Sequence, residues 1–155
     1  MEVKELKKKF EELEKKYKLP SFAELDENFE IFKIDRESDA LLRAVRKQMM
    51  EKIVNSVGFV EMLLNPVNVP RMYFAYMKTM VMEDKNVLEK IYSAFSELIV
   101  SSLQAEVDYN EKNEAELIKK INQIWKANKN GFVKILENVK KPNGVLSKKE
   151  RSYFG

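Results

Sequence analysis

The longest uninterrupted run of apolar residues lies within residues 71–82, which read RMYFAYMKTMVM. Wound into a helix, this stretch would be apolar on every side, a pattern typical of a helix that is buried on every side. At about 1.5 Å per residue it would be far too short to cross a bilayer. We therefore expect a central core helix at residues 71–82, with the rest of the chain packed around it.

The first helix is expected over residues 2–18, where apolar residues recur at alternating intervals of three and four. Such a narrow seam allows two interpretations. The helix could lie along the surface of a bundle, or it could pair with a second copy of the chain. Two heptads are short for a free-standing coiled coil, which favours the bundle. The seam that could form a homodimer consists of Val3, Leu6, Phe10, Leu13 and Tyr17.

Pro20 is expected to end the first helix, because the residue before a proline is pushed out of helical geometry. Ser21 followed by Glu24 matches a capping box and predicts a short helix over residues 22–28. The apolar residues in 29–35 are ambiguous between a continued helix and an extended connector. In either form, an apolar connector this dense should pack against the core of its own chain.

A long helix is predicted over residues 38–64, where one face stays apolar for some seven turns. Asp35 or Ser38 could cap its start, and Asn65 followed by proline should end it. Gly58 falls inside this helix, where it should cost about 1 kcal/mol relative to alanine. A close helix crossing at Gly58 would explain the residue.

A polar turn is expected at residues 83–86, with Asp84 capping a further helix over residues 87–109. One long kinked helix is the alternative, since the apolar period stays almost in phase across the turn. A second polar turn should follow at 110–113, with Asn113 and Glu116 as a capping pair.

The last helix should run over residues 114–140 and continue through Asn130 and Gly131, because the apolar phase holds across them. Its apolar residues fall within an arc of about 120°. Its lysines fall on the opposite side of the helix, which predicts a basic face. These lysines are Lys119, Lys120, Lys126, Lys129, Lys134, Lys140 and Lys141.

Composition points to an all-α fold in a single domain. The chain has 155 residues, enough to bury a sizeable core, and only four glycines and four prolines. We expect an irregular bundle of five to six helices over residues 1–141, followed by a basic C-terminal tail at residues 142–155. The charged first residues do not resemble a signal peptide, and no apolar run is long enough for a transmembrane helix. A cytoplasmic protein is therefore expected.

The chain contains no histidine and no cysteine. Catalytic triads, imidazole acid–base catalysis, thiol nucleophiles and zinc sites built from these side chains are therefore excluded. No cofactor is expected, and an enzyme is the less favoured class. A divalent cation held by carboxylates stays open. The acidic residues that could form such a site flank the apolar connector: Glu24, Asp26, Glu27, Glu30, Asp35, Glu37 and Asp39.

Charge is distributed unevenly along the chain. Residues 117–155 hold ten basic and two acidic residues, a net charge of +8, and the remaining 18 basic and 23 acidic residues give −5. A lysine face could follow a phosphate backbone without reading its sequence. Against this, the face lacks aromatic residues on which bases could stack. The candidate residues for nucleic-acid or acidic-partner binding are Lys119, Lys120, Lys126, Lys129, Lys134, Lys140, Lys141, Lys148, Lys149 and Arg151.

Three functional hypotheses follow. The leading one is a non-catalytic interaction protein that docks onto a larger assembly through its helical faces and its basic C-terminal region, with Tyr153 and Phe154 as a partner anchor. The alternatives are sequence-independent binding of RNA or DNA through the lysines, and an enzyme with a cation bound by carboxylates. Methionine suits both cores and adaptable binding surfaces, so the methionines would matter for binding only if several were exposed together.

Overall fold

The computed structural model describes residues 2–34, 37–65, 67 and 69–141. Within these residues the fold is all-α, as the sequence predicted, and no strand is present. The helices are α1 (Val3–Tyr17), α2 (Phe22–Phe29), the 3-10 turn η1 (Ile31–Lys33), α3 (Leu41–Leu64), the 3-10 turn η2 (Arg71–Tyr73), α4 (Phe74–Thr79), α5 (Met82–Val107) and α6 (Glu111–Lys140).

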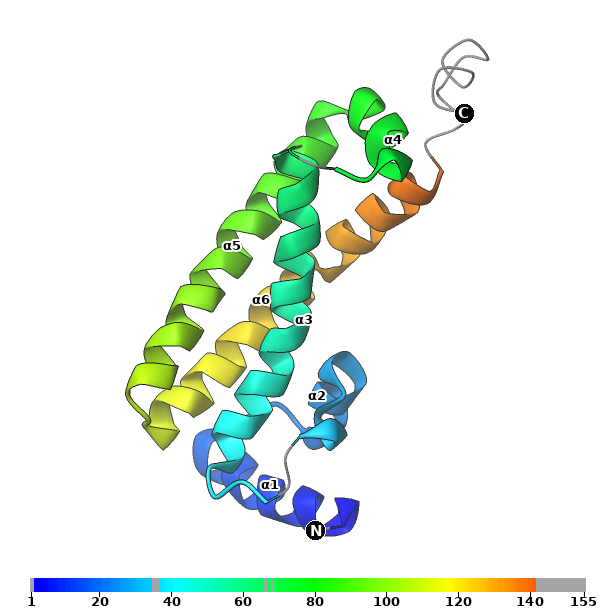
Figure 1. Cartoon of the computed structure of the whole chain (residues 1–155). Helices are drawn as coiled ribbons and strands as arrows, with labels where there is room; N and C mark the ends of the chain where they lie inside the picture. Colours follow the sequence, from blue (N-terminus) through cyan, green and yellow to red (C-terminus); the bar gives the residue numbers. More distant parts are fainter. Residues whose placement is uncertain (1, 35–36, 66, 68, 142–155) are drawn as a thin grey trace.

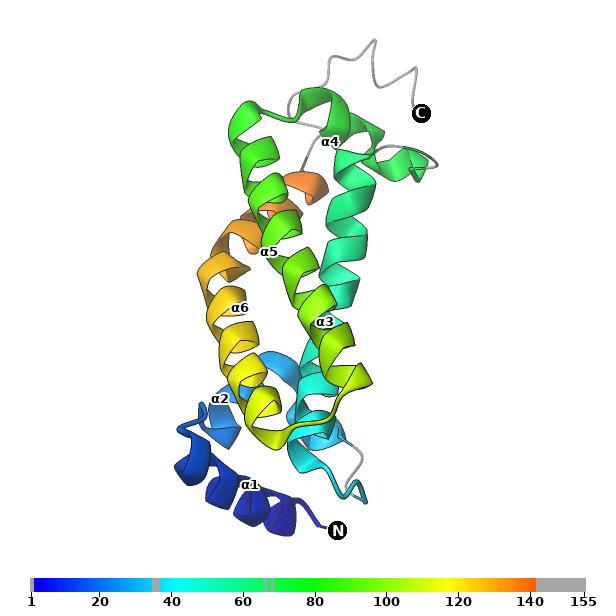
Figure 2. The same cartoon turned by 90° about the vertical axis from the view of Figure 1, so that its left-hand side faces the viewer.

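Three long helices, α3, α5 and α6, pack against one another and form the body of the molecule (Figure 1). The amino-terminal helix α1 lies across one end of this body, and α2 packs on α3 beside it. The short helix α4 lies at the opposite end, as Figure 2 shows from a second side. The centre of the fold is therefore the junction of α3, α5 and α6.

The apolar period of each long helix accounts for this packing. In α5, Leu88, Ile91, Phe95 and Leu98 are fully buried, at the three- and four-residue spacing of a single helix face. Trp125 of α6 packs against Phe95, with ring centroids 6.1 Å apart. Aromatic contacts of this kind add stability beyond the area they bury.

The seam on α1 packs within the chain. Leu6 and Phe10 are fully buried, and Phe10 meets the edge of Phe22 at 5.8 Å between ring centroids. The Tyr17 hydroxyl donates a hydrogen bond of 2.6 Å to Glu111 at the start of α6. The bundle-surface interpretation thus describes this chain, and a homodimer through the same seam would require α1 to leave its site.

The predicted cap of α2 is confirmed, because the Ser21 side chain accepts a 3.1 Å hydrogen bond from the Glu24 amide. The ambiguous connector is neither a continued helix nor an extended strand. Glu30 ends α2 in the left-handed conformation, with φ of 54°, and the turn η1 follows. Ile31 and Ile34 are buried, so the connector packs against the core of its own chain as expected.

Helix α3 ends at Leu64 as predicted, but it begins at Leu41 rather than at residue 38. Its N-cap position has no side-chain hydrogen bond; the Ser38 hydroxyl instead meets the Ala40 amide at 3.3 Å before the helix starts. The expected close crossing at Gly58 is wrong. A methyl group built on Gly58 would meet nothing within 4 Å.

Replacing Gly58 with alanine should therefore raise the free energy of unfolding by about 0.5–1 kcal/mol, because alanine loses less backbone freedom than glycine when the helix forms. Urea unfolding at neutral pH would measure the change. Gly131→Ala in α6 is the matched control, since its new methyl would lie 3.2 Å from a methyl of Val87. If both variants gained the same free energy of unfolding, the open space around Gly58 would not explain the gain there.

The predicted central helix at residues 71–82 is wrong. The stretch is divided among η2, α4 and the start of α5, and it lies at the end of the bundle (Figure 1). Met72 is 72% exposed and Met82 is 67% exposed. Only Tyr76 is fully buried among these twelve residues. The apolar pattern therefore did not mark a helix surrounded by neighbours, because several of these side chains face solvent.

The predicted turn at residues 83–86 is also wrong, as is the alternative of one kinked helix. The helical conformation is interrupted before that predicted turn, at Met80 and Val81, which take extended ψ values of 122° and 158°. Asp84 is consequently inside the first turn of α5 and buried. Its carboxylate accepts hydrogen bonds from the Tyr76 hydroxyl at 3.1 Å and from the side-chain Nδ2 of Asn138 at 3.0 Å. This contact joins α4, α5 and the end of α6, and with burial it raises the pKa of Tyr76.

Helix α6 begins at Glu111, three residues before the predicted start, and its cap is Asn110 rather than Asn113. The Asn110 side chain accepts a 3.1 Å hydrogen bond from the Asn113 amide. The helix continues without a break through Asn130 and Gly131 to Lys140, as the sequence predicted. Among the described residues, no helix combines the length and the apolar character needed to span a membrane.

Candidate functional site

The predicted lysine face lies on α6, and its residues are exposed except for Lys119, which is partly buried. Three of these lysines already contact carboxylates. Lys119 pairs with Glu116 at 3.0 Å, Lys120 with Glu97 of α5 at 3.1 Å, and Lys126 with Glu24 of α2 at 2.7 Å. The face is therefore a mixture of opposite charges along the half of α6 that packs near α1 and α2.

The other lysines of the face are spread along the rest of α6. Lys129 approaches the side-chain oxygen of Asn28 at 3.4 Å. Lys134, Lys140 and Lys141 are exposed toward the α4 end. The remaining predicted site residues lie outside the described residues: Lys148, Lys149, Arg151, Tyr153 and Phe154. Binding through any of these lysines stays a prediction.

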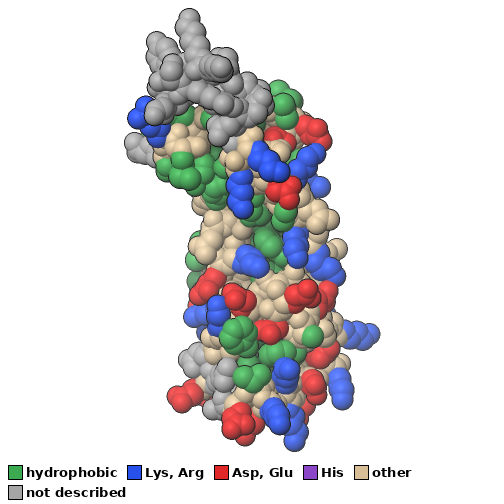
Figure 3. Space-filling model, turned by 90° about the vertical axis from the view of Figure 1, so that its right-hand side faces the viewer, with side chains coloured by type: hydrophobic (Ala, Val, Ile, Leu, Met, Phe, Trp, Pro, Cys, Tyr) green, Lys and Arg blue, Asp and Glu red, His purple; other side chains and the backbone are tan. Residues whose placement is uncertain are grey.

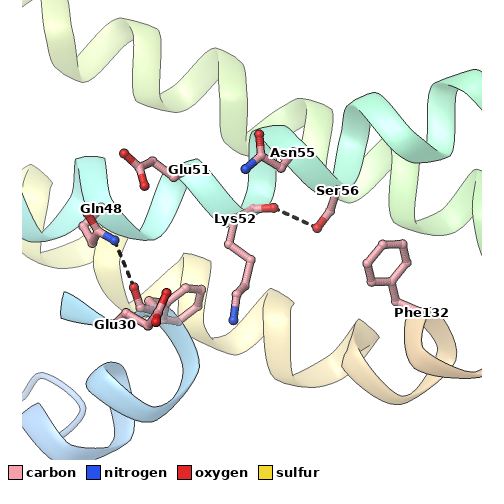
Figure 4. A pocket seen from close by; sticks show the side chains of 8 residues that line it. Glu30, Gln48, Glu51, Lys52, Asn55, Ser56 and Phe132 are labelled. Carbon is pink, nitrogen blue, oxygen red and sulfur yellow. Dashed lines mark hydrogen bonds between the residues drawn. The ribbon is translucent and has the colours of Figure 1, made fainter. Parts of the chain in front are cut away.

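A pocket of about 350 Å³ opens between α2, α3 and α6, and Lys52 of α3 extends across it (Figure 4). The Lys52 ammonium lies 5.7 Å from the ring centre of Phe29 and 5.0 Å from that of Trp125. It also donates a hydrogen bond to the carbonyl oxygen of Asn28. The pocket is lined by Phe29, Glu30, Gln48, Glu51, Lys52, Asn55, Ser56 and Phe132.

Burial lowers the pKa of Lys52 from its ordinary value of 10.5, with repulsion from Lys129 adding to the effect and Glu30 opposing it. A lysine with a lowered pKa in a pocket is a candidate nucleophile. Here the ammonium is already engaged by a carbonyl and two aromatic faces, which favour its charged form. Gln48 likewise donates to the Phe29 carbonyl at 3.3 Å. Lys52 and Gln48 therefore both donate hydrogen bonds to carbonyls at the end of α2. These hydrogen bonds give the pocket a structural role.

Among the acidic residues beside the connector, Asp35 lies outside the described residues, and the described ones do not converge. Asp26 accepts a 2.9 Å hydrogen bond from the Phe32 amide, Glu30 pairs with Lys33 at 3.1 Å, and Glu24 pairs with Lys126. Within residues 2–34, 37–65, 67 and 69–141, no three acidic side chains are grouped closely enough to hold a metal ion. Local turn formation and ion pairing account for Asp26, Glu30 and Glu24.

A buried ion pair joins α3 to the start of α6, and sequence reasoning missed it. Arg46 is 1% exposed and Glu114 is fully buried. The guanidinium donates to both oxygens of the Glu114 carboxylate, at 2.8 and 3.0 Å, and to the Ser102 hydroxyl at 2.8 Å. Glu106 lies 2.8 Å from the same guanidinium. Burial opposes the charge on Arg46, but the two carboxylates outweigh it and raise its pKa.

Arg43, one turn before Arg46, completes this polar cluster at the end of α5. Its guanidinium donates to the carbonyl oxygens of Ala105 and Glu106, at 3.3 and 2.8 Å, and lies 5.5 Å from the ring centre of Tyr109. Carbonyls in the last turn of a helix have no partner within the helix, so a cation there satisfies them. The cluster fixes the turn between α5 and α6, and its members Arg46 and Ser102 also line a pocket of about 530 Å³ between α3 and α5.

An exposed apolar surface lies at the α4 end of the molecule, where Figure 3 shows hydrophobic side chains. Val81 is 56% exposed there, and Met72 and Met82 are exposed as well. Met77 and Met80 are partly buried against the core behind them. Met72 and Met82 are thus exposed, although the sequence predicted both of them in the core. We call Val67, Met72, Phe74, Val81 and Met82 the apolar end.

No family model matches the chain, and neither a curated protein nor a solved structure is similar to it at a significant level.

Proposed function

We propose that the protein is a non-catalytic interaction module that docks onto a protein partner through the apolar end. The observation that carries this proposal is the exposure of Met72, Val81 and Met82 in one short stretch of the chain. Scattered apolar residues are normal on a protein surface, but a group of them often marks a site of association.

The chemistry of the apolar end suits contact with an apolar partner surface. Methionine side chains are unbranched and polarisable, so they adapt to the shape of a partner at low cost. Behind them, Tyr76 and Asp84 hold α4 to α5 through their hydrogen bond. The surface thus combines flexible side chains with a fixed backbone, which reduces the ordering that binding requires. The lack of histidine and cysteine in the whole chain agrees with a role without catalysis.

The double variant Met72→Glu/Met82→Glu should lose its partner while its helical circular dichroism stays unchanged. Both side chains are largely exposed, and a glutamate at the first turn of α5 suits the helix dipole. The tagged protein would be recovered from the cells it comes from at low salt, and the associated proteins compared by mass spectrometry. Recovery should fall at least about tenfold, the effect of losing one contact of about 1.4 kcal/mol.

Val107→Glu is the matched control, because Val107 is 89% exposed at the other end of α5. It adds one negative charge to the same helix and should leave the partner bound. A partner that stays on the double variant would contradict docking through the apolar end. Partners that disappear after nuclease treatment would instead favour the alternative, nucleic-acid binding through the lysines of α6.

A further inference from the structure

A second pocket, of about 380 Å³, lies where the end of α1 and the start of α2 meet the middle of α6. Its walls carry three lysines, Lys119 and Lys126 on α6 and Lys18 from the distant end of α1. The lining also contains one carboxylate, Glu24, so its net charge is +2. The other lining residues are Leu19, Pro20, Asn122 and Gln123. We call this the lysine pocket.

Two of these lysines already pair with carboxylates, Lys126 with one in the pocket lining and Lys119 with one outside it. Lys126 pairs with Glu24 at 2.7 Å, and Lys119 pairs with Glu116 at 3.0 Å. Lys18 takes the left-handed conformation, with φ of 56°, and its amide donates to the Glu14 carbonyl. Left-handed geometry is unfavourable for a lysine. The break in the chain at the end of α1 therefore places the Lys18 side chain beside the lysines of α6.

Asn122 gives an independent reason to expect a ligand. Its side chain lines the lysine pocket and is 5% exposed, yet its amide oxygen has no hydrogen-bond partner among the described residues. A buried polar atom without a partner costs about 1–3 kcal/mol, so such atoms are rare. The oxygen and nitrogen of an asparagine amide can exchange places by rotation. The oxygen is not accessible in this conformation, so a ligand in the pocket would meet it only after the Asn122 side chain rotates toward the pocket.

We propose that the lysine pocket binds the phosphate group of a small phosphorylated molecule. Three ammonium groups approaching from two separate segments can surround a doubly charged, tetrahedral anion, and lysine is a common phosphate ligand. A volume of about 380 Å³ falls within the usual range for small-molecule sites. Asn122 and Gln123 would then contact the remainder of the molecule. This inference is independent of the apolar end, which lies at the opposite end of the bundle.

Titration of the ¹⁵N-labelled protein with glycerol 3-phosphate, at constant ionic strength, would test the proposal by NMR. The amide signals of residues 18–24 and 119–126 should shift and saturate. Inorganic phosphate should produce the same shifts with weaker affinity, because it lacks the groups that would meet Asn122 and Gln123. An equal affinity for the two would show an anion site without a place for the rest of the molecule, and sodium chloride shifting the same signals would remove the site altogether.

Two variants should weaken binding without disturbing the fold. Lys18→Asn/Lys119→Gln removes two charges, and asparagine tolerates the left-handed conformation better than most residues do. Gln123→Glu adds a negative charge to an exposed lining residue of nearly the same shape. Each should raise the dissociation constant at least about tenfold, as the loss of a charged hydrogen bond does.

Lys134→Gln is the matched control, because Lys134 is exposed on the same helix outside the pocket lining. It should leave the affinity unchanged, and a loss as large as in the pocket variants would reduce the effect to general electrostatics. A single-stranded oligonucleotide serves as the last probe. If it bound through Lys119 and Lys126 while glycerol 3-phosphate did not, the lysines would belong to a nucleic-acid surface and the proposal would be wrong.

Discussion

Replacing Arg46 with methionine is expected to lower the free energy of unfolding by about 3–5 kcal/mol, because it leaves the fully buried Glu114 carboxylate without its main partner. In the native protein, Arg46 meets that carboxylate through two hydrogen bonds. Methionine fills much of the volume of the arginine stem, so the loss would come from the uncompensated charge rather than from a cavity. Arg43 lies 4.0 Å from the same carboxylate and replaces little of the contact.

Urea unfolding followed by circular dichroism would measure this change. The double variant Arg46→Met/Glu114→Leu is the control, because removing both charges removes the penalty for leaving one unpaired. It should be much more stable than Arg46→Met alone. Glu106→Gln should cost only about 1 kcal/mol, since Glu106 is partly exposed and water can replace its ion pair. If the double variant were as unstable as Arg46→Met, the loss would come from packing instead of charge.

Met49→Ala should lower the free energy of unfolding by about 2–5 kcal/mol, whereas Met72→Ala should change it by no more than about 0.5 kcal/mol. Met49 is fully buried in α3, and its truncation leaves a cavity at the junction of the three long helices. Met72 is mostly in solvent, so its truncation removes few contacts. The pair compares the same substitution at the observed centre of the fold and at the centre that the sequence predicted.

Thermal and urea unfolding of both variants, under identical conditions, would give the two values. A large loss in Met72→Ala, equal to that in Met49→Ala, would place residues 71–82 in the core after all. A small loss in both would mean that the junction of α3, α5 and α6 relaxes to fill the cavity. Only the predicted asymmetry agrees with the structure.

Periodic spacing explains which elements the sequence predicted well. Leu88, Ile91, Phe95 and Leu98 repeat at helical intervals, and each is buried where the repeat requires. The cap formed by Ser21 and Glu24 was equally predictable, because it depends on two residues three apart. Predictions failed where the local pattern has no clear boundary. Met80 and Val81 are apolar, as Met77 and Met82 on either side of them are, and neither is a glycine or proline, although the chain turns there.

The apolar content of residues 71–82 could not reveal whether other elements cover them, since that depends on packing between distant segments. The cluster around Arg46 was missed for a related reason. Arg46 follows Val45 on the buried face of α3, but a charged residue in such a pattern is normally assigned to solvent. Its partner Glu114 lies 68 residues away along the chain. A signal existed in retrospect, because a helix rotation that buries Val45 and Met49 also carries Arg46 inward.

The same dependence on distant segments holds for the lysine pocket. The sequence identified Lys119 and Lys126 as basic residues on one side of a helix. It could not place Lys18 beside them, because that contact joins the end of α1 to the middle of α6. Nor could it show that Glu24 of α2 already pairs with Lys126, whereas the pair of Glu116 and Lys119 follows from their spacing of three on one helix. Charge counted along a helix therefore overstates the positive surface that the folded chain presents.

The contacts at the end of α2 have a consequence for the order of folding. An eight-residue helix is too short to be stable alone in water, even though Ser21 caps its start and the Glu30 amide donates to the Asp26 carbonyl at its end. Two further carbonyls at that end, those of Phe29 and Asn28, accept hydrogen bonds from Gln48 and Lys52 of α3. Those donors stand one turn apart on a helix of 24 residues, and they come into position only after that helix has formed. Helix α2 is thus completed on α3 as on a template, late in the sequence of folding events.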